Sequence, residues 1–243
     1  MKALIFAAGL GTRLKPLTDT MPKALVPING KPLLEHQILK MKKMGFDHLV
    51  INVHHFADQI IDFLSKNNNF GLKIDISDER NLLLETGGGV KKAASFFTDE
   101  KPFLIHNVDI LSNIDLQSFY TENASKSLIS LLVNQRKTSR YLLFNEEKRL
   151  VGWTNVQTGE VKSPFANLNV DQCKKYAFSG IQIFSPKVFP LMNTFGDRFS
   201  IVDFYLSVAD KIEIRAVVDE KMQILDVGKV DSLKSAENLL TNL

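Results

Sequence analysis

Short apolar runs alternate with amphipathic segments through the first half of the chain. Residues 3–8 are continuously apolar and end at Gly9, which is typical of a parallel strand covered on both faces. Further strands are predicted at residues 49–53, 73–77, 103–105 and 128–133. Helical periodicity lies between them, at residues 32–45, 56–64, 90–97 and 116–124. This alternation predicts an α/β fold with a Rossmann-like, mostly parallel sheet flanked by helices.

The pattern changes after about residue 136. Strands are predicted at 141–144, 150–153 and 176–184 with little helix between them, which indicates a small mixed or antiparallel lobe. Ser200 and Asp203 resemble a capping box for a helix through Val208. Two strands at 212–217 and 222–225 and a helix over 233–240 follow. We therefore expect one domain over 1–243, with a first part at about 1–135, a smaller lobe at about 136–200, and a C-terminal part at about 200–243 completing the core.

Composition narrows the class of protein. Apolar residues make up 44% of the chain, enough for a substantial core. No run of about 18 apolar residues is present, so no membrane span is predicted. Cys173 is the single cysteine, which excludes a disulfide or a cysteine-based zinc site within one chain. A reducing, cytoplasmic location is therefore expected.

Charge is concentrated near the N-terminus. The formal net charge is +3, but residues 1–50 hold eight basic and three acidic residues. A balance of +3 is too small for the broad basic face of a general nucleic-acid binder. A local basic cluster instead fits a small anionic ligand.

The loop after the first strand has features of a phosphate-binding turn. Gly9 and Gly11 let the backbone approach a ligand, and Arg13 has the planar fork that suits phosphate. Two common phosphate motifs are absent, however. Leu14 stands where the dinucleotide fingerprint needs a third glycine, and Pro32 follows Gly30-Lys31 where a Walker loop needs Ser or Thr.

Five strings, in order along nearly the whole chain, carry a more specific resemblance. They are Gly9 to Leu14 with Pro16-Leu17-Thr18 and Pro22-Lys23, Leu84 to Gly89, Asn107-Val108-Asp109, Phe178 to Ile181, and Asp226-Val227-Gly228. Together they resemble the sugar-phosphate nucleotidyltransferases. The resemblance implies a sugar-1-phosphate nucleotidyltransferase that joins a nucleoside triphosphate to a sugar 1-phosphate, releases pyrophosphate and uses Mg²⁺.

The resemblance also implies that the part at about 1–135 binds the nucleotide and that the lobe at about 136–200 binds the sugar. It identifies Arg13 and Lys23 as catalytic residues and Asp109 and Asp226 as Mg²⁺ ligands. Each of the two aspartates follows a predicted strand. Nucleotide binding is assigned to Ala8, Gly9, Gly11, Thr12, Arg13, Glu85, Thr86, Gly87 and Gly88, and sugar binding to Asn107, Ser179 and Gly180. The sugar phosphate is an anionic nucleophile, so the reaction needs charge neutralisation and positioning more than a general base.

The glycines at 87–89 are expected to precede a helix and to let backbone N–H groups read a base edge.

The sequence departs from the family pattern at three places. Val108 occupies a position where glycine is usual, and valine does not easily take a positive φ. The Glu-Lys-Pro segment that supplies a sugar-phosphate lysine is missing, and Lys174 or Lys175 are candidate replacements. Lys229 stands where threonine is common.

Within the family, Leu84–Gly89 and Phe178–Ile181 are most similar to the branch of bacterial cell-wall recycling that transfers a uridylyl group to N-acetylmuramate 1-phosphate. Guanylyl transfer to mannose or heptose 1-phosphate and cytidylyl transfer to phosphocholine are the alternatives. A non-catalytic regulatory subunit is the alternative outside enzymes. The expected partners are a nucleoside triphosphate and a sugar 1-phosphate, with no nucleic acid and no membrane. We expect a monofunctional enzyme, as a monomer or a homo-oligomer.

Three histidines are not assigned to the site. His54 and His55 have no helical partner for a metal, and His106 is expected to pack at a strand end. Trp153 is expected to pack within the lobe, and Cys173 to have no catalytic role.

Overall fold

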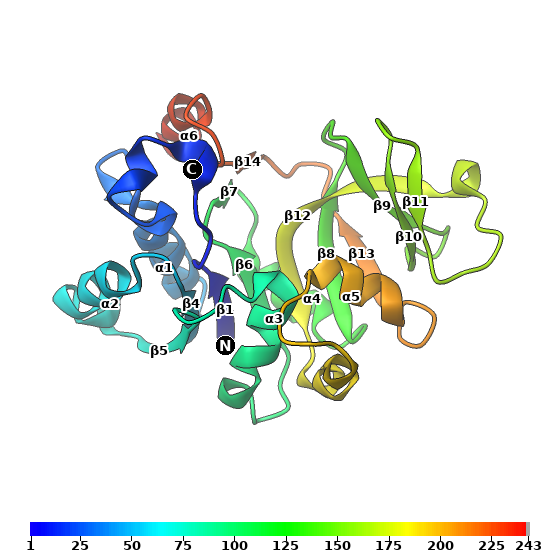
Figure 1. Ribbon diagram of the computed structural model, residues 1–243, viewed down its shortest axis with the longest axis horizontal. Helices are drawn as coiled ribbons and strands as arrows, with labels where there is room; N and C mark the ends of the chain where they lie inside the picture. Colours follow the sequence, from blue (N-terminus) through cyan, green and yellow to red (C-terminus); the bar gives the residue numbers. More distant parts are fainter. Residues whose placement is uncertain (242–243) are drawn as a thin grey trace. The chain divides into compact units, whose positions relative to one another are not determined.

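The computed structural model describes residues 1–241 of the chain, which divides into two compact units (Figure 1). Unit 1 comprises Met1–Leu84, Ile105–Phe119 and Gln223–Leu243. Unit 2 comprises Glu85–Leu104 and Tyr120–Met222. Each unit is therefore assembled from pieces that are far apart in the sequence. The functional bounds expected near residues 135 and 200 stay a prediction.

Unit 1 is built on a parallel sheet. The strand β1 (Lys2–Phe6) pairs in parallel with β4 (His48–Val53), and β4 pairs in parallel with β5 (Lys73–Asp78). Residues of β6 (Phe103–Asn107) lie on the other side of β1. Every residue of β4 is buried, including the polar residues His48 and Asn52, and the other four are apolar. The α/β fold expected from the alternating pattern is confirmed.

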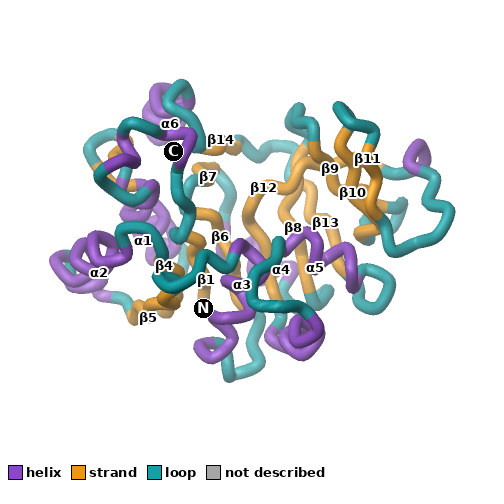
Figure 2. The backbone as a smooth tube through the Cα atoms, in the orientation of Figure 1, coloured by secondary structure: helices purple, strands orange, loops and turns teal. Residues whose placement is uncertain are grey.

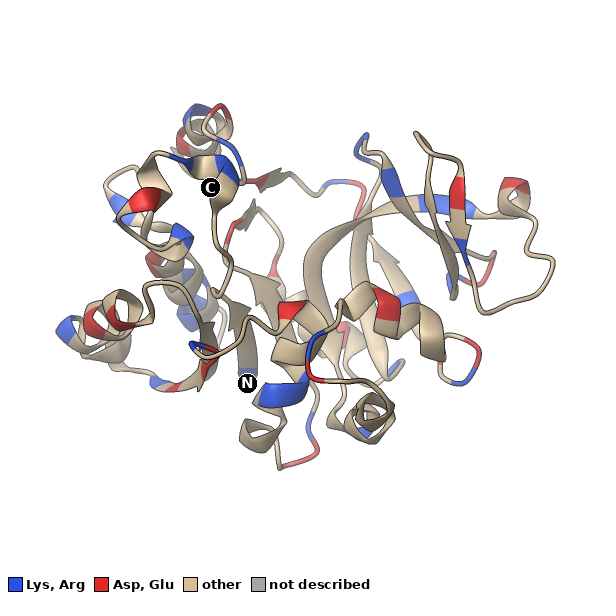
Figure 3. Cartoon of the chain, in the orientation of Figure 1, with Lys and Arg blue, Asp and Glu red and all other residues tan. Residues whose placement is uncertain are grey.

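The helices of unit 1 follow their predicted periodicity. They are α1 (Leu33–Lys43), α2 (Ala57–Lys66), the first half of α4 (Leu116–Asn123) and α6 (Ser232–Thr241). In α1, Leu34, Ile38 and Met41 are fully buried, and Gly45 with φ 81° follows the helix end. Figure 3 shows charged residues along α1 and α2, whereas β4 has none. Among residues 1–241, no helix has the length and apolar character needed to cross a bilayer.

Unit 1 also contains a two-stranded antiparallel ribbon. It pairs β7 (Ile110–Ser112) with β14 (Ile224–Asp226) and lies outside the main sheet. A three-residue strand such as β7 is too short to show periodicity, so the sequence pattern does not predict it. A second short ribbon pairs β2 (Pro27–Ile28) with β3 (Lys31–Pro32).

Unit 2 contains a mixed sheet (Figure 2). The long strand β12 (Lys174–Phe184) pairs antiparallel with β8 (Ile129–Asn134) and with β9 (Arg140–Phe144). From β9 the sheet continues antiparallel through β10 (Leu150–Asn155) to β11 (Glu160–Lys162). On the other side, β13 (Ile214–Val218) pairs with β8 in parallel. The mixed and antiparallel organisation expected for this segment is confirmed.

Two helices of unit 2 bear on the site. The helix α5 (Ile201–Val208) begins where predicted, and Ser200 Oγ accepts a hydrogen bond of 3.2 Å from the Val202 N–H. The helix α3 (Glu85–Lys92) begins earlier than predicted and includes the glycines at 87–89, while residues 93–96 form a 3₁₀ turn. The expectation that the glycines precede the helix is therefore wrong. Their contact with Phe199 overrides their low helix propensity.

Candidate functional site

The loop at residues 9–23 is folded back on itself at the end of β1. Gly11 has φ 65°, and a Cβ there would lie 2.8 Å from Thr18 Cγ2 and 3.0 Å from Lys23 Cβ. The Thr18 hydroxyl donates a hydrogen bond of 2.8 Å to the Gly11 carbonyl. Both the backbone angle and the close packing thus require glycine at this position. The fold of the loop brings Lys23 next to its glycine-rich start.

The first residues of the loop differ in exposure. Gly9, Thr12 and Arg13 are exposed, as a ligand-facing loop requires. Ala8 is buried, and its N–H donates to Asn52 Oδ1 at 3.2 Å. The Ala8 amide is therefore used inside the protein, so the first loop amide on an exposed residue is that of Gly9.

Lys23 is a buried cation with a carboxylate partner. Its Nζ donates a hydrogen bond to Asp109 Oδ2, and the two side chains are only 10% and 19% exposed. Asp109 lies in the turn between β6 and β7, 86 residues along the chain. An ordinary surface lysine would extend into water, so this geometry indicates a positioned charge.

The β7–β14 ribbon brings Asp226 to Asp109. Asp226 is the register partner of Ile110, and the Val227 N–H donates to the Asp109 carbonyl at 2.8 Å. Val108 is buried, is not among the residues with a positive φ, and its N–H donates to the Phe6 carbonyl at 3.1 Å. The turn therefore accommodates valine where the family usually has glycine.

Gly228 lies next to the side chains of both Asp226 and Arg13. A Cβ on Gly228 would lie 2.6 Å from Asp226 Oδ1 and 2.7 Å from Arg13 Nη2. Arg13 and Asp226 are exposed, and Arg13 forms no ion pair within residues 1–241. The missing side chain thus keeps open the space on which both charged groups border. Unit 1 gathers four predicted site residues, Arg13, Lys23, Asp109 and Asp226.

The two aspartates fit a divalent cation of the Mg²⁺ type. Carboxylate oxygens are hard ligands, and Mg²⁺ is commonly held by one or two carboxylates together with substrate phosphates and water. Asp109 retains its second oxygen beside the one that Lys23 binds, and Asp226 Oδ1 borders the space kept open by Gly228. Residues 1–241 contain no cluster of three or more metal-ligating side chains, so the remaining ligands would come from substrate and solvent.

The helix α1 supports the turn that carries Asp109. Gln37 Nε2 donates to the Ile110 carbonyl at 2.6 Å, and Lys40 Nζ donates to the Ser112 carbonyl at 2.5 Å. Burial lowers the pKa of Lys40 to about 8, against a smaller raising effect of the charge of Asp115. Both contacts hold the strand that directly follows Asp109.

The glycines of α3 are packed against the segment before α5. The Gly87 and Gly88 N–H groups donate to the Phe199 carbonyl at 2.8 and 3.3 Å. A Cβ on Gly87 would lie 2.4 Å from two atoms of the Phe199 ring. Packing within unit 2 therefore explains glycine at 87, and these two amides already have an acceptor. The assignment of Gly87 and Gly88 to nucleotide binding stays a prediction.

The polar residues before these glycines are also held within unit 2. Thr86 Oγ1 accepts a hydrogen bond of 3.0 Å from the Ile201 N–H, and Arg198 Nε donates to Glu85 Oε1 at 3.0 Å. Glu85 has φ 61°, an uncommon conformation for a residue other than glycine. These contacts fix the direction in which α3 begins, and the nucleotide-binding role of both residues stays a prediction.

The three residues predicted to bind sugar have different surroundings. Asn107 ends β6, and its carbonyl lies 2.8 Å from His106 Nδ1. Ser179 is 1% exposed, and its Oγ donates to the Leu132 carbonyl at 2.5 Å. Gly180 has φ 77° and lies in the register shift of β12. The Ser179 hydroxyl is thus used inside the sheet.

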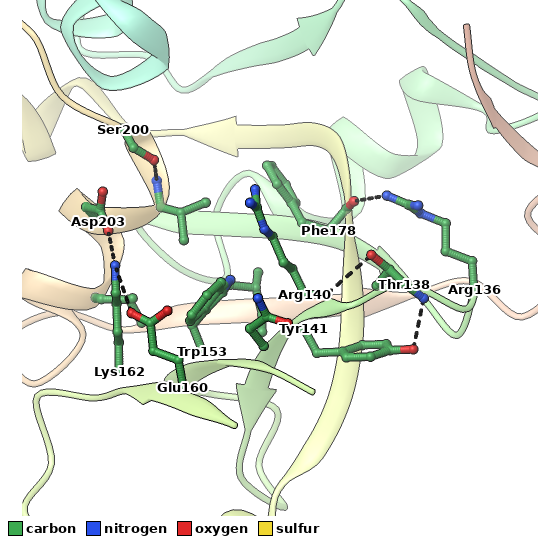
Figure 4. A pocket seen from close by; sticks show the side chains of 14 residues that line it. Arg136, Thr138, Arg140, Tyr141, Trp153, Glu160, Lys162, Phe178, Ser200 and Asp203 are labelled. Carbon is green, nitrogen blue, oxygen red and sulfur yellow. Dashed lines mark hydrogen bonds and ion pairs between the residues drawn. The ribbon is translucent and has the colours of Figure 1, made fainter. Parts of the chain in front are cut away.

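A pocket in unit 2, which we call the basic pocket, is lined by Phe178, the residue before Ser179, among others, and has a volume of about 500 Å³ (Figure 4). Its charged and aromatic lining includes Arg136, Arg140, Trp153, Glu160, Lys162 and Asp203. The volume is in the range of small-molecule sites. Sequence reasoning missed this pocket, because its residues come from separate strands, a loop and the start of α5. Lys174 and Lys175 are exposed and do not line it.

The cations of the basic pocket differ in their partners. Lys162 Nζ lies 5.4 Å from the Trp153 ring centroid and 3.6 Å from Asp203 Oδ1. Arg136 Nη2 donates to the Phe178 carbonyl at 3.5 Å. The Arg140 guanidinium forms no hydrogen bond or ion pair in the described part of the chain, and it extends into the pocket (Figure 4). Arg140 is therefore the cation most available to an anionic ligand.

The histidines have structural surroundings. His54 Nδ1 lies 2.7 Å from the Glu79 carbonyl, and the His55 ring lies 4.0 Å from the Phe56 ring. His106 is fully buried, and its burial lowers its pKa to about 3, with a further lowering from the charge of Lys40. His106 is thus neutral at physiological pH.

Comparison with protein families agrees with this arrangement. A profile of the family described as nucleotidyl transferase matches residues 2–242. The chain therefore belongs to the nucleotidyl transferase family.

Two curated relatives share one name. The N-acetylmuramate alpha-1-phosphate uridylyltransferase of Neisseria meningitidis serogroup B is 40% identical over 125 residues, which are 51% of this chain and 54% of that protein. The enzyme of the same name from Caulobacter vibrioides is 44% identical over 109 residues, 44% of this chain and 45% of that protein. The matched segments thus span about half the length of these relatives.

A solved structure matches almost the whole chain. It is HddC from Yersinia pseudotuberculosis complexed with GMP-PN, with a TM-score of 0.75 and 25% sequence identity. The match covers 98% of this chain and 99% of that chain. The two proteins therefore share their fold along their full lengths.

Proposed function

We propose that the protein transfers a nucleoside monophosphate from a nucleoside triphosphate to a sugar 1-phosphate. The favoured donor is UTP and the favoured acceptor is N-acetylmuramate 1-phosphate. The observation that carries the proposal is the gathering of Arg13, Lys23, Asp109 and Asp226 within unit 1. Two cations and two carboxylates at the end of a parallel strand are suited to a triphosphate and its metal.

The bond changes need no general base. A phosphate oxygen of the acceptor attacks the α-phosphorus, a new P–O bond forms, and the bond from the α-phosphorus to the bridging oxygen breaks. Pyrophosphate leaves with that electron pair. Arg13 would stabilise the leaving pyrophosphate, and Lys23 would neutralise charge at the α-phosphate where two anions must meet. The exposure of Arg13 supports its role, and burial supports a fixed position for Lys23.

Asp109 and Asp226 would hold Mg²⁺. When bound, the ion would offset the negative charge of the triphosphate and the leaving pyrophosphate. In the protein alone, Lys23 balances the charge of Asp109. Gly228 supports the assignment because it leaves the Asp226 carboxylate accessible beside Arg13.

The basic pocket supports an acidic sugar as the acceptor. N-Acetylmuramate carries a carboxylate, and a guanidinium binds a carboxylate with two parallel hydrogen bonds. Arg140 has no partner of its own among residues 1–241, so it is available for this contact. A cationic choline group would instead require an open aromatic face, and Lys162 already lies over Trp153. The pocket thus favours an acidic sugar over phosphocholine, and both relatives at 40% identity or more bear the name of a muramate enzyme.

Guanylyl transfer to a mannose or heptose 1-phosphate is the second candidate. The specific observation in its favour is the match over 98% of the chain to a structure bound to GMP-PN. A non-catalytic regulatory subunit is disfavoured, because Arg13, Lys23, Asp109 and Asp226 are all present and gathered.

A pyrophosphate-release assay tests the proposal. It crosses UTP, GTP, CTP, dTTP and ATP with N-acetylmuramate, N-acetylglucosamine, glucose, mannose and heptose 1-phosphates and phosphocholine, with Mg²⁺ or with EDTA. We expect the fastest release with UTP and N-acetylmuramate 1-phosphate in Mg²⁺. Fastest release with GTP and mannose or heptose 1-phosphate would select the second candidate, and no release with any pair would contradict both.

Single substitutions test the roles of three of the four residues. Arg13→Ala, Lys23→Ala and Asp109→Ala are each expected to lower turnover by about 10²–10³-fold, the usual effect of removing a charge-stabilising group. Lys15→Ala is the matched control, because Lys15 lies in the same loop with its side chain 62% exposed. Full activity of Asp109→Ala at saturating Mg²⁺ would remove the metal assignment.

Arg140→Gln tests the acceptor. We expect the KM for N-acetylmuramate 1-phosphate to rise about tenfold, the value of one charge-assisted contact, while the KM for N-acetylglucosamine 1-phosphate, which lacks the carboxylate, stays unchanged. Lys174→Gln is the control, because this exposed cation does not line the pocket. An equal change in both KM values would assign Arg140 to a group that the two acceptors share.

A further inference from the structure

A buried polar pair lies next to the backbone that leads into the loop at residues 9–23. Asn52, in β4, is 3% exposed, and Glu79, directly after β5, is 1% exposed. Asn52 Oδ1 accepts hydrogen bonds from the Ala7 and Ala8 N–H groups at 2.7 and 3.2 Å. Asn52 Nδ2 donates to Glu79 Oε1 at 2.8 Å, and the Leu84 N–H donates to Glu79 Oε2 at 3.2 Å. The pair thus links two separate stretches of backbone.

Both stretches lead into segments assigned to the nucleotide. Ala7 and Ala8 follow the last residue of β1 and precede Gly9, where the exposed loop begins. Leu84 precedes Glu85, the first residue of α3. A chain that leaves a sheet loses its ladder partners, so its N–H groups need other acceptors. Asn52 supplies these acceptors where the chain leaves β1, and Glu79 supplies one for the Leu84 N–H directly before α3.

Burial of this polar pair has a desolvation cost that a purely structural role would not require. Leu4, Ile5, Val50 and Ile51 in the neighbouring strands are fully buried, so a carboxylate and a carboxamide must be desolvated beside them. Apolar side chains would avoid that cost but would leave the backbone donors without partners. The hydrogen bonds instead hold each of the two backbone stretches in one conformation, which is the property that a binding loop requires.

We infer that Asn52 and Glu79 are positioning residues for the nucleoside triphosphate. They hold the Ala7 and Ala8 amides inward, so that the amides from Gly9 onward face the ligand. Neither side chain touches the substrate. The inference rests on the proposed function and names residues that act through the backbone of the site.

The donor and acceptor roles in these hydrogen bonds allow a specific test. Asn52→Asp keeps the acceptor for Ala7 and Ala8 but places an oxygen against Glu79 Oε1. Glu79→Gln leaves one oxygen for two donors, the Asn52 amide and the Leu84 N–H. The double variant Asn52→Asp/Glu79→Gln restores these two hydrogen bonds, because the glutamine amide donates to the new carboxylate and its oxygen accepts from Leu84. The formal charge of the double variant equals that of the natural pair.

Steady-state kinetics with UTP, or with whichever nucleotide the release assay selects, provides the measurement. We expect each single variant to raise the KM for the nucleotide at least tenfold, with the KM for the acceptor within threefold of the natural protein. The double variant is expected to return the nucleotide KM to within threefold. Ser77→Ala is the matched control, since Ser77 is buried, is the register partner of Asn52 in β5 and has no hydrogen-bond partner for its hydroxyl within residues 1–241.

Several outcomes would overturn the inference. They are an unchanged nucleotide KM in both single variants, equal changes in both KM values, and no recovery in the double variant. A single variant that does not fold would assign the pair to the core and also overturn it. Failure of the proposed function would be distinct, because the natural protein itself would then release no pyrophosphate.

Discussion

At Gly228 the lack of a side chain has a chemical consequence. Its Cα borders the Asp226 carboxylate and the Arg13 guanidinium, and an alanine methyl would lie 2.6 and 2.7 Å from them. One of the two charged groups would have to move away to make room.

Gly228→Ala is therefore expected to lower turnover by at least about tenfold, since small displacements of positioned groups are costly in catalysis. Thermal stability should change little, because both neighbouring side chains are exposed and can shift. The measurement is kcat with the melting temperature beside it. Gly196→Ala is the control, because nothing lies within 4 Å of a Cβ there. Unchanged kcat in Gly228→Ala would contradict the need for open space.

His106 is expected to make the protein sensitive to acid. Its pKa is lowered to about 3 by burial, so the folded state keeps it neutral while the unfolded chain takes up a proton below about 6.5. The unfolded state then binds more protons, and stability falls as the pH falls from about 6.5 toward 3. Between pH 7 and 5 the share of His106 is about 2 kcal/mol.

Urea unfolding at pH 7 and pH 5 checks this share. We expect the natural protein to lose about 2 kcal/mol more than His106→Gln over this interval. An equal loss in both proteins would mean that His106 becomes charged within the fold.

At the scale of single residues, the motifs predicted the four charged side chains but not their contacts. Arg13, Lys23, Asp109 and Asp226 were identified through strings that a family shares. The burial of Lys23 against Asp109 was not predictable, because 86 residues separate the two and no local pattern encodes a distant ion pair. Arg140 was missed for a related reason, since an isolated arginine in a strand carries no signal of the pocket it enters.

At the scale of elements, α3 shows how a contact overrides intrinsic preference. Glycine disfavours helix by about 1 kcal/mol relative to alanine, yet α3 includes three in succession. The Gly87 and Gly88 amides reach the Phe199 carbonyl, and only glycine at 87 leaves room for the Phe199 ring.

Gly87→Ala is expected to destabilise the protein by about 1–3 kcal/mol, the usual cost of overpacking, although alanine is the better helix former. The free energy of unfolding in urea is the measurement. Phe199→Leu in the same background is expected to recover part of the loss, because it removes the two ring atoms that lie 2.4 Å from the added methyl. Stabilisation by Gly87→Ala would show that helix propensity outweighs the contact.

The long alternating elements were predictable and the short ones were not. The strands β1, β4 and β5 were predicted to within two residues. The first two are buried and mostly apolar, as parallel strands inside a sheet are, whereas β5 alternates apolar and polar residues. The strand β7 has three residues, too few for a period, and β14 has pairing that only the folded ribbon defines. The start of α3 was misplaced because glycine propensity points away from helix.

At the scale of the whole molecule, nucleotide binding is expected to stabilise the fold. A ligand that binds only the folded state at 100 times its Kd adds about 2.7 kcal/mol, which raises the melting temperature of a protein of this size by about 5–10 °C. We expect this increase with UTP and Mg²⁺ and a much smaller one with UTP and EDTA. Asp226→Asn is expected to reduce the part that depends on Mg²⁺, and an equal increase in EDTA would contradict a role for the metal in nucleotide binding.

Net charge describes this molecule poorly because it averages over separate clusters. Residues 1–50 carry the basic excess, and two of its members are Arg13 and Lys23. The rest of the chain is slightly acidic overall, with 22 basic and 24 acidic residues, yet it forms the basic pocket of unit 2. The uneven charge along the sequence therefore indicated the basic cluster near the N-terminus but not the basic pocket, because the local field depends on position in space, which composition does not contain.

The β7–β14 ribbon has a consequence for the order in which the protein is made. Synthesis delivers Arg13, Lys23 and Asp109 early, whereas Asp226 and Gly228 come from the ribbon's last strand and the residues just beyond it. Because domains form as the chain emerges from the ribosome, a nascent chain halted before Gln223 would present the loop and one carboxylate but not their partners. Under the proposed function, transfer at this site must wait until β14 has docked, so an unfinished chain would not consume nucleotide.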